Sequence, residues 1–174
     1  CERVEVTRER IEIKDGCLLE GVFFSRVEEE EAYSTFLDSQ AGWYEIKYPK
    51  NISEEKLEEM QAFMDEVARL IEESDSLEAY ERLKEMVDIE SFIQMFLLDE
   101  ISNEADLNRA STFYFVADDG KLYAGPVWDY DRSMGNVKSS QYELLDCFTV
   151  GLGEKLFRSP YFRQDVADSY NARY

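Results

Sequence analysis

The period of the apolar residues changes near Ser53, and this change constrains the fold more than any other feature of the chain. Before it, at residues 4–13, valine and isoleucine alternate with charged residues, as in a half-buried pair of strands. After it, apolar residues recur every three or four positions, as on one face of a helix. The chain is therefore predicted to be an α+β protein, with a small antiparallel β region over residues 1–50 and a mainly helical lobe over 51–174.

Two further stretches of the first part are expected to form strands. Lys14-Asp15-Gly16 is a turn signal, and an apolar run follows it from Cys17 to Phe24. Residues 43–48 return to strand-like composition and are stopped by Pro49. Residues 26–41, which are acidic, are expected to be irregular.

The second part contains start signals for helices. Ser53 is a suitable N-cap for the stripe that follows, which consists of Leu57, Met60, Phe63, Met64, Val67, Leu70 and Ile71. A short helix is expected over residues 77–86. Asp88 is expected to cap a third helix, which is apolar over much of its circumference and is therefore predicted to be central and buried. A last helix is expected over residues 160–171.

A hairpin is predicted between these helices. Residues 112–116 and 121–124 flank Ala117-Asp118-Asp119-Gly120, which is a strong hairpin turn signal. Asp106 precedes the first strand, and Asp129 follows the second. Because an antiparallel hairpin returns the chain beside its start, the residues outside its open end are expected to share one site. An aspartate in such a position also commonly caps a helix or turn, and for Asp106 alone both interpretations stay open.

The chemistry of these aspartates suits phosphoryl transfer. Asp129 and Asp131 stand two residues apart, and two carboxylates that close repel each other unless a cation or a proton lies between them. The Mg²⁺ of a nucleotide usually takes one or two protein carboxylates, and a separate aspartate can accept the proton of the attacking hydroxyl. We expect Asp106 to be the catalytic residue and Asp129 the metal ligand, with Asp131 or Asn108 assisting.

Two other sites that use Asp-x-Asp are excluded. A calcium-binding EF-hand loop needs glycine at its sixth position and glutamate at its twelfth, where this chain has Met134 and Ser140. A haloacid-dehalogenase-like phosphatase opens its domain with the motif and needs a long sheet behind it, whereas too few residues follow Asp131 here.

Composition excludes several classes of function. The net charge of −20 makes nucleic acid and anionic membranes poor partners and would attract a basic protein segment or a divalent metal. A solvated acidic surface is the favoured explanation of the charge. The absence of histidine rules out Ser-His catalysis and histidine-ligated zinc within this chain. No apolar run is long enough to insert into a membrane. The oligomeric state is left open.

The three cysteines, Cys1, Cys17 and Cys147, fit neither a dense disulfide framework nor zinc-ligand spacing, and Cys147 is expected to be a buried thiol. Trp43 and Trp128 are expected to be core or platform residues. Lys47 could form a salt bridge or contact phosphate, but an exposed strand lysine is the favoured interpretation.

The chain resembles the CotH kinase family of spore coat proteins, most strongly over residues 88–137. The resemblance rests on the segments Ser91–Glu100, Asn103, Asp106, Ser111–Phe115, Asp119–Pro126 and Trp128–Asn136, with weaker matches at residues 1–13 and 45–49. It implies that residues 1–174 form a single partial domain, the carboxyl-terminal portion of an atypical kinase with a protein-kinase-like fold.

The resemblance also implies a function. Members of the family are secreted, cell-surface or spore-coat proteins that transfer phosphate from ATP to serine or threonine hydroxyls of proteins, with Mg²⁺ or Mn²⁺. It implies that Asp106 is catalytic and that Asp129 binds metal, while Asp131 and Asn136 belong to the same motif without an assigned role.

The chain departs from the family pattern in its first part. Residues 1–50 contain no glycine loop that could cover phosphates, and we expect that the nucleotide-covering portion precedes Cys1. Ser111 stands where protein kinases carry an asparagine for a second metal. Enzymatic activity of this chain by itself is therefore an open question. The alternatives are a non-catalytic coat or cell-surface assembly module that retains the fold, and a calcium-stabilised adhesion domain.

Overall fold

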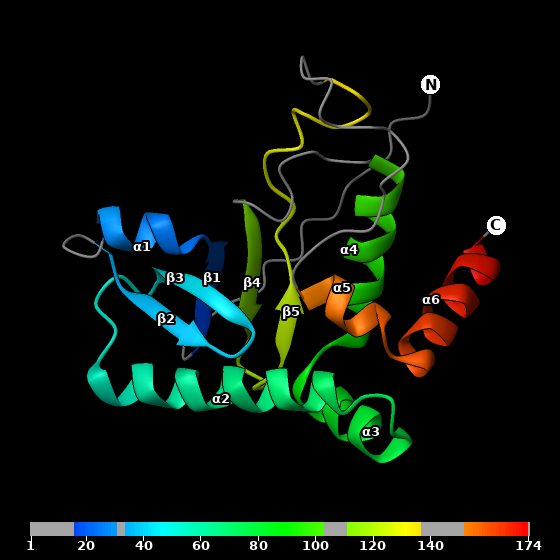
Figure 1. The fold of residues 1–174 in the computed structure, drawn as a ribbon, viewed down its shortest axis with the longest axis horizontal. Helices are drawn as coiled ribbons and strands as arrows, with labels where there is room; N and C mark the ends of the chain where they lie inside the picture. Colours follow the sequence, from blue (N-terminus) through cyan, green and yellow to red (C-terminus); the bar gives the residue numbers. More distant parts are fainter. Residues whose placement is uncertain (1–15, 31–33, 103–110, 137–151, 174) are drawn as a thin grey trace.

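An antiparallel sheet with the strand order β2-β3-β1-β4-β5 organises the computed structural model of the protein (Figure 1). The structure describes residues 16–30, 34–102, 111–136 and 152–173. The strands are β1 (Cys17–Val22), β2 (Phe36–Ser39), β3 (Gly42–Tyr48), β4 (Thr112–Val116) and β5 (Leu122–Ala124). The helices are α1 (Phe24–Glu30), α2 (Glu54–Glu72), α3 (Leu77–Met86), α4 (Ile89–Ser102), α5 (Leu152–Phe157) and α6 (Pro160–Arg173). The predicted strand pair at residues 4–13 and the predicted thiol Cys147 lie outside the described residues.

Strand β1 is the centre of the sheet. It pairs with β3 on one side and with β4 on the other, both antiparallel. Its residues Cys17 and Leu19 are fully buried, as expected for a strand covered by other elements. The predicted hairpin is confirmed as β4 and β5, and the structure adds it to the same sheet as β1.

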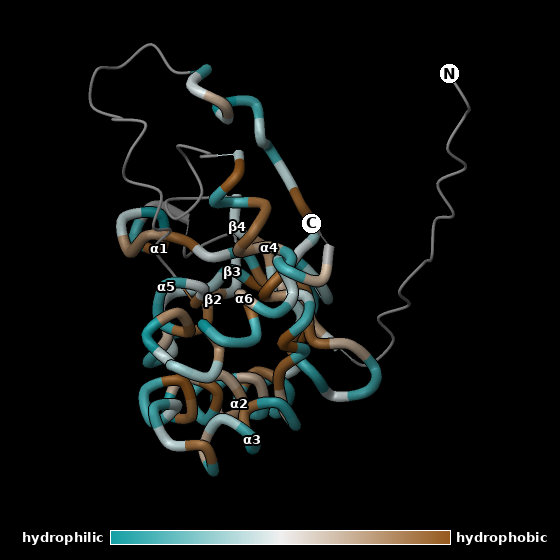
Figure 2. Tube along the Cα trace, turned by 90° about the vertical axis from the view of Figure 1, so that its right-hand side faces the viewer, coloured by the Kyte–Doolittle hydropathy of each residue, from teal (hydrophilic) through white to brown (hydrophobic). Residues whose placement is uncertain are grey.

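Helix α2 covers one side of this sheet. The Ser53 hydroxyl accepts a hydrogen bond from the Lys56 backbone N–H at 3.2 Å, which confirms the predicted N-cap. Most of the apolar stripe of the helix is buried, with Met64 and Val67 wholly inaccessible, while Leu57 and Phe63 are half-buried. Helix α2 contacts both β2 and α3. Figure 2 shows α2 and α3 together on one side of the molecule, with hydrophilic and hydrophobic residues interleaved along both.

Helix α4 holds the hairpin in place. It is capped by Asp88, whose carboxylate accepts the Ser91 backbone N–H at 2.8 Å, as predicted. The Ser91 hydroxyl accepts the Ala124 N–H of β5 at 3.1 Å, and the ring of Phe92 stacks on that of Tyr114 of β4 with centroids 5.9 Å apart. The first turns of α4 are buried as expected, but near its end the side chain of Ile101 is 57% exposed, so the predicted burial is wrong there.

The expectation that residues 26–41 are irregular is wrong. They contain most of α1 and all of β2. Helix α1 buries Val27, while β2 pairs with β3 so that Leu37 is only 1% exposed. These elements are short, and contacts with the rest of the fold stabilise them where composition alone predicts a loop.

The fold class is α+β, as predicted, and is compatible with part of a kinase-like domain. Among the described helices, none combines the length and the apolar composition that a membrane crossing requires. The division into a β-rich part and a helical lobe stays a prediction.

Candidate functional site

The described part of the candidate site lies at the open end of the β4–β5 hairpin. The Gly125 backbone N–H donates to the Phe113 carbonyl at 2.8 Å, just outside the last paired residues of the hairpin. Ser111 directly precedes β4 and Gly125 directly follows β5, so the chain enters and leaves the hairpin at this end. Asp106 lies five residues before Ser111 in the sequence, and Asp129 lies four residues after Gly125.

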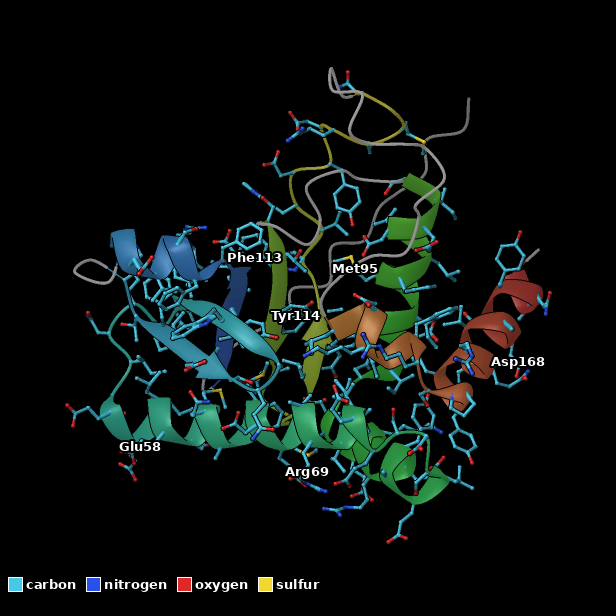
Figure 3. The ribbon with its side chains drawn as sticks, in the orientation of Figure 1. Glu58, Arg69, Met95, Phe113, Tyr114 and Asp168 are labelled. Carbon is cyan, nitrogen blue, oxygen red and sulfur yellow. The ribbon has the colours of Figure 1, made fainter. Side chains whose placement is uncertain are left out.

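Two aromatic residues attach the loop that carries Asp129. The Trp128 ring packs edge-on against Phe113 of β4, with centroids 6.4 Å apart and an interplanar angle of 73°. The Tyr130 hydroxyl donates a hydrogen bond to the Asp99 carboxylate on α4. Figure 3 labels Phe113 on β4 and, on α4, Met95, the sulfur of which lies 3.5 Å from the same hydroxyl. The loop is thus fixed to a strand on one side of Asp129 and to a helix on the other.

Asp129 itself has a left-handed backbone with φ of 59°. This conformation is uncommon for a residue other than glycine, although aspartate tolerates it better than most. Asp129 lies between the two aromatic attachments, and its side chain is exposed to solvent.

The remainder of the motif folds back onto the end of α4. The Met134 backbone N–H donates to the Ser102 carbonyl at 2.6 Å. The Asn136 side-chain amide donates to the Asp131 backbone carbonyl at 2.6 Å, which gives Asn136 a role in shaping the loop. The Asp131 carboxylate stays exposed. Figure 1 shows this loop leaving β5 and running beside α4.

The structure describes two of the four predicted site residues. Asp129 and Asp131 lie on one exposed loop, whereas Asp106 and Asn108 lie outside the described residues. Exposed carboxylates are the oxygen ligands that Mg²⁺ and Mn²⁺ prefer, so the donor type fits a hard divalent cation. Within the described part of the chain, no three acidic or cysteine side chains gather closely enough to hold a metal by themselves.

A cluster of four charged side chains lies on the sheet next to this end of the hairpin. We call it the charge cluster; it consists of Glu20 of β1, Arg26 of α1, and Glu45 and Lys47 of β3. Glu20 and Glu45 are cross-strand partners and are only 6% and 7% exposed. Lys47 Nζ lies 3.0 Å from a carboxylate oxygen of each, and Arg26 bridges the same two carboxylates at 3.1 and 2.9 Å.

The two cations determine the ionisation of the cluster. Burial raises the pKa of Glu20, but the hydrogen bond and charge of Lys47, together with the charge of Arg26, outweigh it, so the pKa of Glu20 lies below its ordinary value. Burial lowers the pKa of Lys47, but its bonds to Glu45 and Glu20 outweigh it, so that pKa is raised. The directions of these two shifts keep Glu20 and Lys47 both charged near neutral pH.

Sequence reasoning missed this cluster. The favoured interpretation of Lys47 as an exposed strand lysine is wrong, because its side chain is only 31% exposed and bridges two carboxylates. The available signal was a single acidic residue, Glu20, inside an apolar strand, together with Glu45 and Lys47 at alternate positions and hence on one face of β3.

The structure narrows the prediction that the two tryptophans are core or platform residues. Trp128 is not a core residue, since 60% of it is exposed, and its ring packs edge-on against Phe113. Trp43 is half-buried, and its ring lies 5.3 Å from that of Phe24.

Comparison with protein families identifies the family of this chain. The family model described as CotH kinase protein matches residues 7–174. The chain belongs to the CotH kinase family. The match covers both the acidic loop of residues 126–136 and the strands that carry the charge cluster. Comparisons with curated proteins and with solved structures found no match.

Proposed function

We propose that this CotH-family chain is part of an atypical protein kinase, which transfers the γ-phosphate of ATP to serine or threonine hydroxyls of a protein. The observation that carries the proposal is the attachment of the acidic loop. Trp128 and Tyr130 hold Asp129 beside the end of the hairpin at which the chain arrives from Asp106. Family membership supports the same reaction class.

In this proposal each acidic residue has one task. Asp106 accepts the hydroxyl proton as the substrate oxygen forms a bond to the γ-phosphorus, while the bond from that phosphorus to the bridging oxygen breaks and ADP leaves. Asp129 holds Mg²⁺ or Mn²⁺, assisted by Asp131 or Asn108. The metal, when bound, neutralises negative charge on the β- and γ-phosphates.

The acidic charge of the chain favours one kind of substrate. With 39 acidic and 19 basic side chains, the chain attracts cations over long range. We therefore propose that the protein substrate presents its hydroxyl within a basic segment. The association of the CotH family with spore coats supports action at the spore coat or cell surface.

Phosphate transfer from labelled ATP tests the proposal. The full-length protein as it is encoded should label a basic serine-containing protein in the presence of Mn²⁺ or Mg²⁺. Asp106→Asn and Asp129→Asn should each lower transfer by at least about a hundredfold, since each removes a group that acts on the reacting atoms or the metal. If both variants transfer phosphate as fast as the wild type, the assignment of the site is wrong. If the wild type neither binds nucleotide nor transfers phosphate, the non-catalytic assembly module is the better description.

A further inference from the structure

The acidic loop of residues 126–136 exposes apolar side chains beside the proposed metal ligands. Val127, Trp128 and Met134 are each more than half exposed. A single exposed apolar residue is ordinary on a protein surface, but several on one short loop are typical of a site where another molecule binds. The side chains of Asp129 and Asp131 are exposed on the same loop. The loop therefore offers a partner both apolar surface and negative charge.

The ring of Trp128 is held in an orientation that suits such a contact. It meets the ring of Phe113 at an interplanar angle of 73°, so the edge of one ring lies against the face of the other. This contact leaves at least one face of the indole ring uncovered by Phe113. Because the contact restricts rotation of the side chain, Trp128 loses less conformational entropy on binding than a mobile side chain would.

The chemistry of the loop favours an arginine as the bound group. The face of an indole ring attracts cations, and the planar guanidinium of arginine also stacks on it, which the ammonium group of lysine does not do. The carboxylates of Asp129 and Asp131 lie within three positions of Trp128 in the sequence, and the chain carries a net charge of −20. Arg132, on the same loop, already has an interaction within the protein. The cation is therefore expected to come from another molecule.

We propose that Trp128 is a specificity-determining residue, which binds an arginine of the protein substrate close to the serine or threonine that is phosphorylated. The inference rests on the proposed kinase function. Trp128 directly precedes Asp129, the proposed ligand of the metal that neutralises the γ-phosphate. The substrate hydroxyl must approach that phosphate, so the residues that flank it come near Trp128. Since an extended peptide advances about 3.3 Å per residue, we expect the arginine within about three residues of the hydroxyl.

Pairs of peptides test the inference. Each peptide contains one serine and, at one position within three residues of it, either arginine or citrulline, which has a similar shape without the charge. With the full-length protein and Mn²⁺–ATP, Trp128→Leu should lower kcat/KM for the best arginine peptide about fivefold, the factor that corresponds to about 1 kcal/mol of cation–π attraction. For its citrulline partner, kcat/KM should change by less than about 1.5-fold. Tyr48→Leu, which removes another exposed aromatic ring at the end of β3, should change neither value.

Calorimetry with the same peptides measures binding without phosphate transfer. The arginine peptide should bind Trp128→Leu about fivefold more weakly than the wild type, and the wild type should bind a lysine peptide about threefold more weakly than the arginine peptide. Equal losses for the arginine and citrulline peptides in Trp128→Leu, or no loss for the arginine peptide, would overturn the proposal. If Trp128→Leu does not fold, the comparison of arginine with lysine in the wild type decides, because charge alone predicts equal binding. If the wild type transfers phosphate to no peptide, the kinase function is refuted, while calorimetry still decides whether Trp128 binds arginine.

Discussion

Replacing Lys47 with methionine should destabilise the fold strongly, because it leaves two buried carboxylates facing each other. Lys47 makes a 3.0 Å contact with each of Glu20 and Glu45. Breaking a buried pair by removing one partner costs about 3–5 kcal/mol. Since the Lys47 side chain is 31% exposed and Arg26 still bridges both carboxylates, we expect the lower end of that range, about 3 kcal/mol.

The pH dependence of this loss follows from the direction of the pKa shifts. The pKa of Glu20 is lowered from 4.5, so its stabilising contribution is present above that value and is lost as the pH falls through the folded-state pKa. The pKa of Lys47 is raised from 10.5, so its contribution is present below that value and is lost as the pH rises through the folded-state pKa. The difference in unfolding free energy between the wild type and Lys47→Met should therefore have its full size between pH 4.5 and pH 10.5. This difference should become smaller at lower pH, because protonation of Glu20 removes the repulsion between the two carboxylates that Lys47 no longer neutralises in the variant.

Urea unfolding followed by circular dichroism, at about pH 7 and again at about pH 3.5, measures this gap. The control is Lys56→Met. Lys56 pairs with Glu59 at the same distance of 3.0 Å, but Glu59 is 62% exposed, so the expected loss is below about 0.5 kcal/mol. A loss for Lys47→Met below about 1 kcal/mol at neutral pH, or one that does not change on acidification, would refute the reasoning.

Three tyrosines supply further predictions. Tyr130→Phe removes the hydrogen bond to Asp99, so the loop around Asp129 loses its attachment to α4. The variant should bind Mn²⁺–ATP about fivefold to tenfold more weakly than the wild type in calorimetry. Unchanged binding would contradict this prediction. Tyr123→Phe, which loses a hydroxyl bond at the turn end of the hairpin, is its control and should bind as the wild type does. Tyr80→Phe breaks the 2.7 Å bond to Asp165 that links α3 to α6 and should cost about 1 kcal/mol in urea unfolding. A change of under about 0.3 kcal/mol would mean that this link contributes little.

Long periodic segments could be predicted from the sequence because their signal is local. Helix α2 begins at a serine cap and continues for 19 residues, and the structure buries most of its apolar stripe, as expected. The hairpin was predictable because its turn residues specify the reversal within a few positions. Helix α1 and strand β2 were not predictable, since seven and four residues are too few for a period to emerge. Their stability comes from partners distant in the sequence.

The same difference between local signals and long-range contacts decides which parts of the candidate site could be predicted. Asp129 and Asp131 were visible because they are adjacent in the sequence and follow a predicted strand. The charge cluster was not, because it depends on the register that sets Glu20 opposite Glu45, and that register exists only once β1 and β3 pair. The attachment of Tyr130 to Asp99 depends likewise on where α4 lies relative to the hairpin. Sequence patterns thus gave the candidate ligands, and the tertiary structure gave the groups that hold them.

Binding of Mn²⁺–ATP and phosphate transfer, measured on the same full-length variants, test the central claim most directly. Asp129→Asn should lose both binding and transfer, whereas Asp106→Asn should keep binding within about threefold and lose transfer, because a proton acceptor is not needed to hold the nucleotide. Asp118→Asn, at the turn end of the same hairpin, should behave as the wild type. If Asp129→Asn binds Mn²⁺–ATP as tightly as the wild type, the metal does not lie on the acidic loop, and the account of this site is wrong.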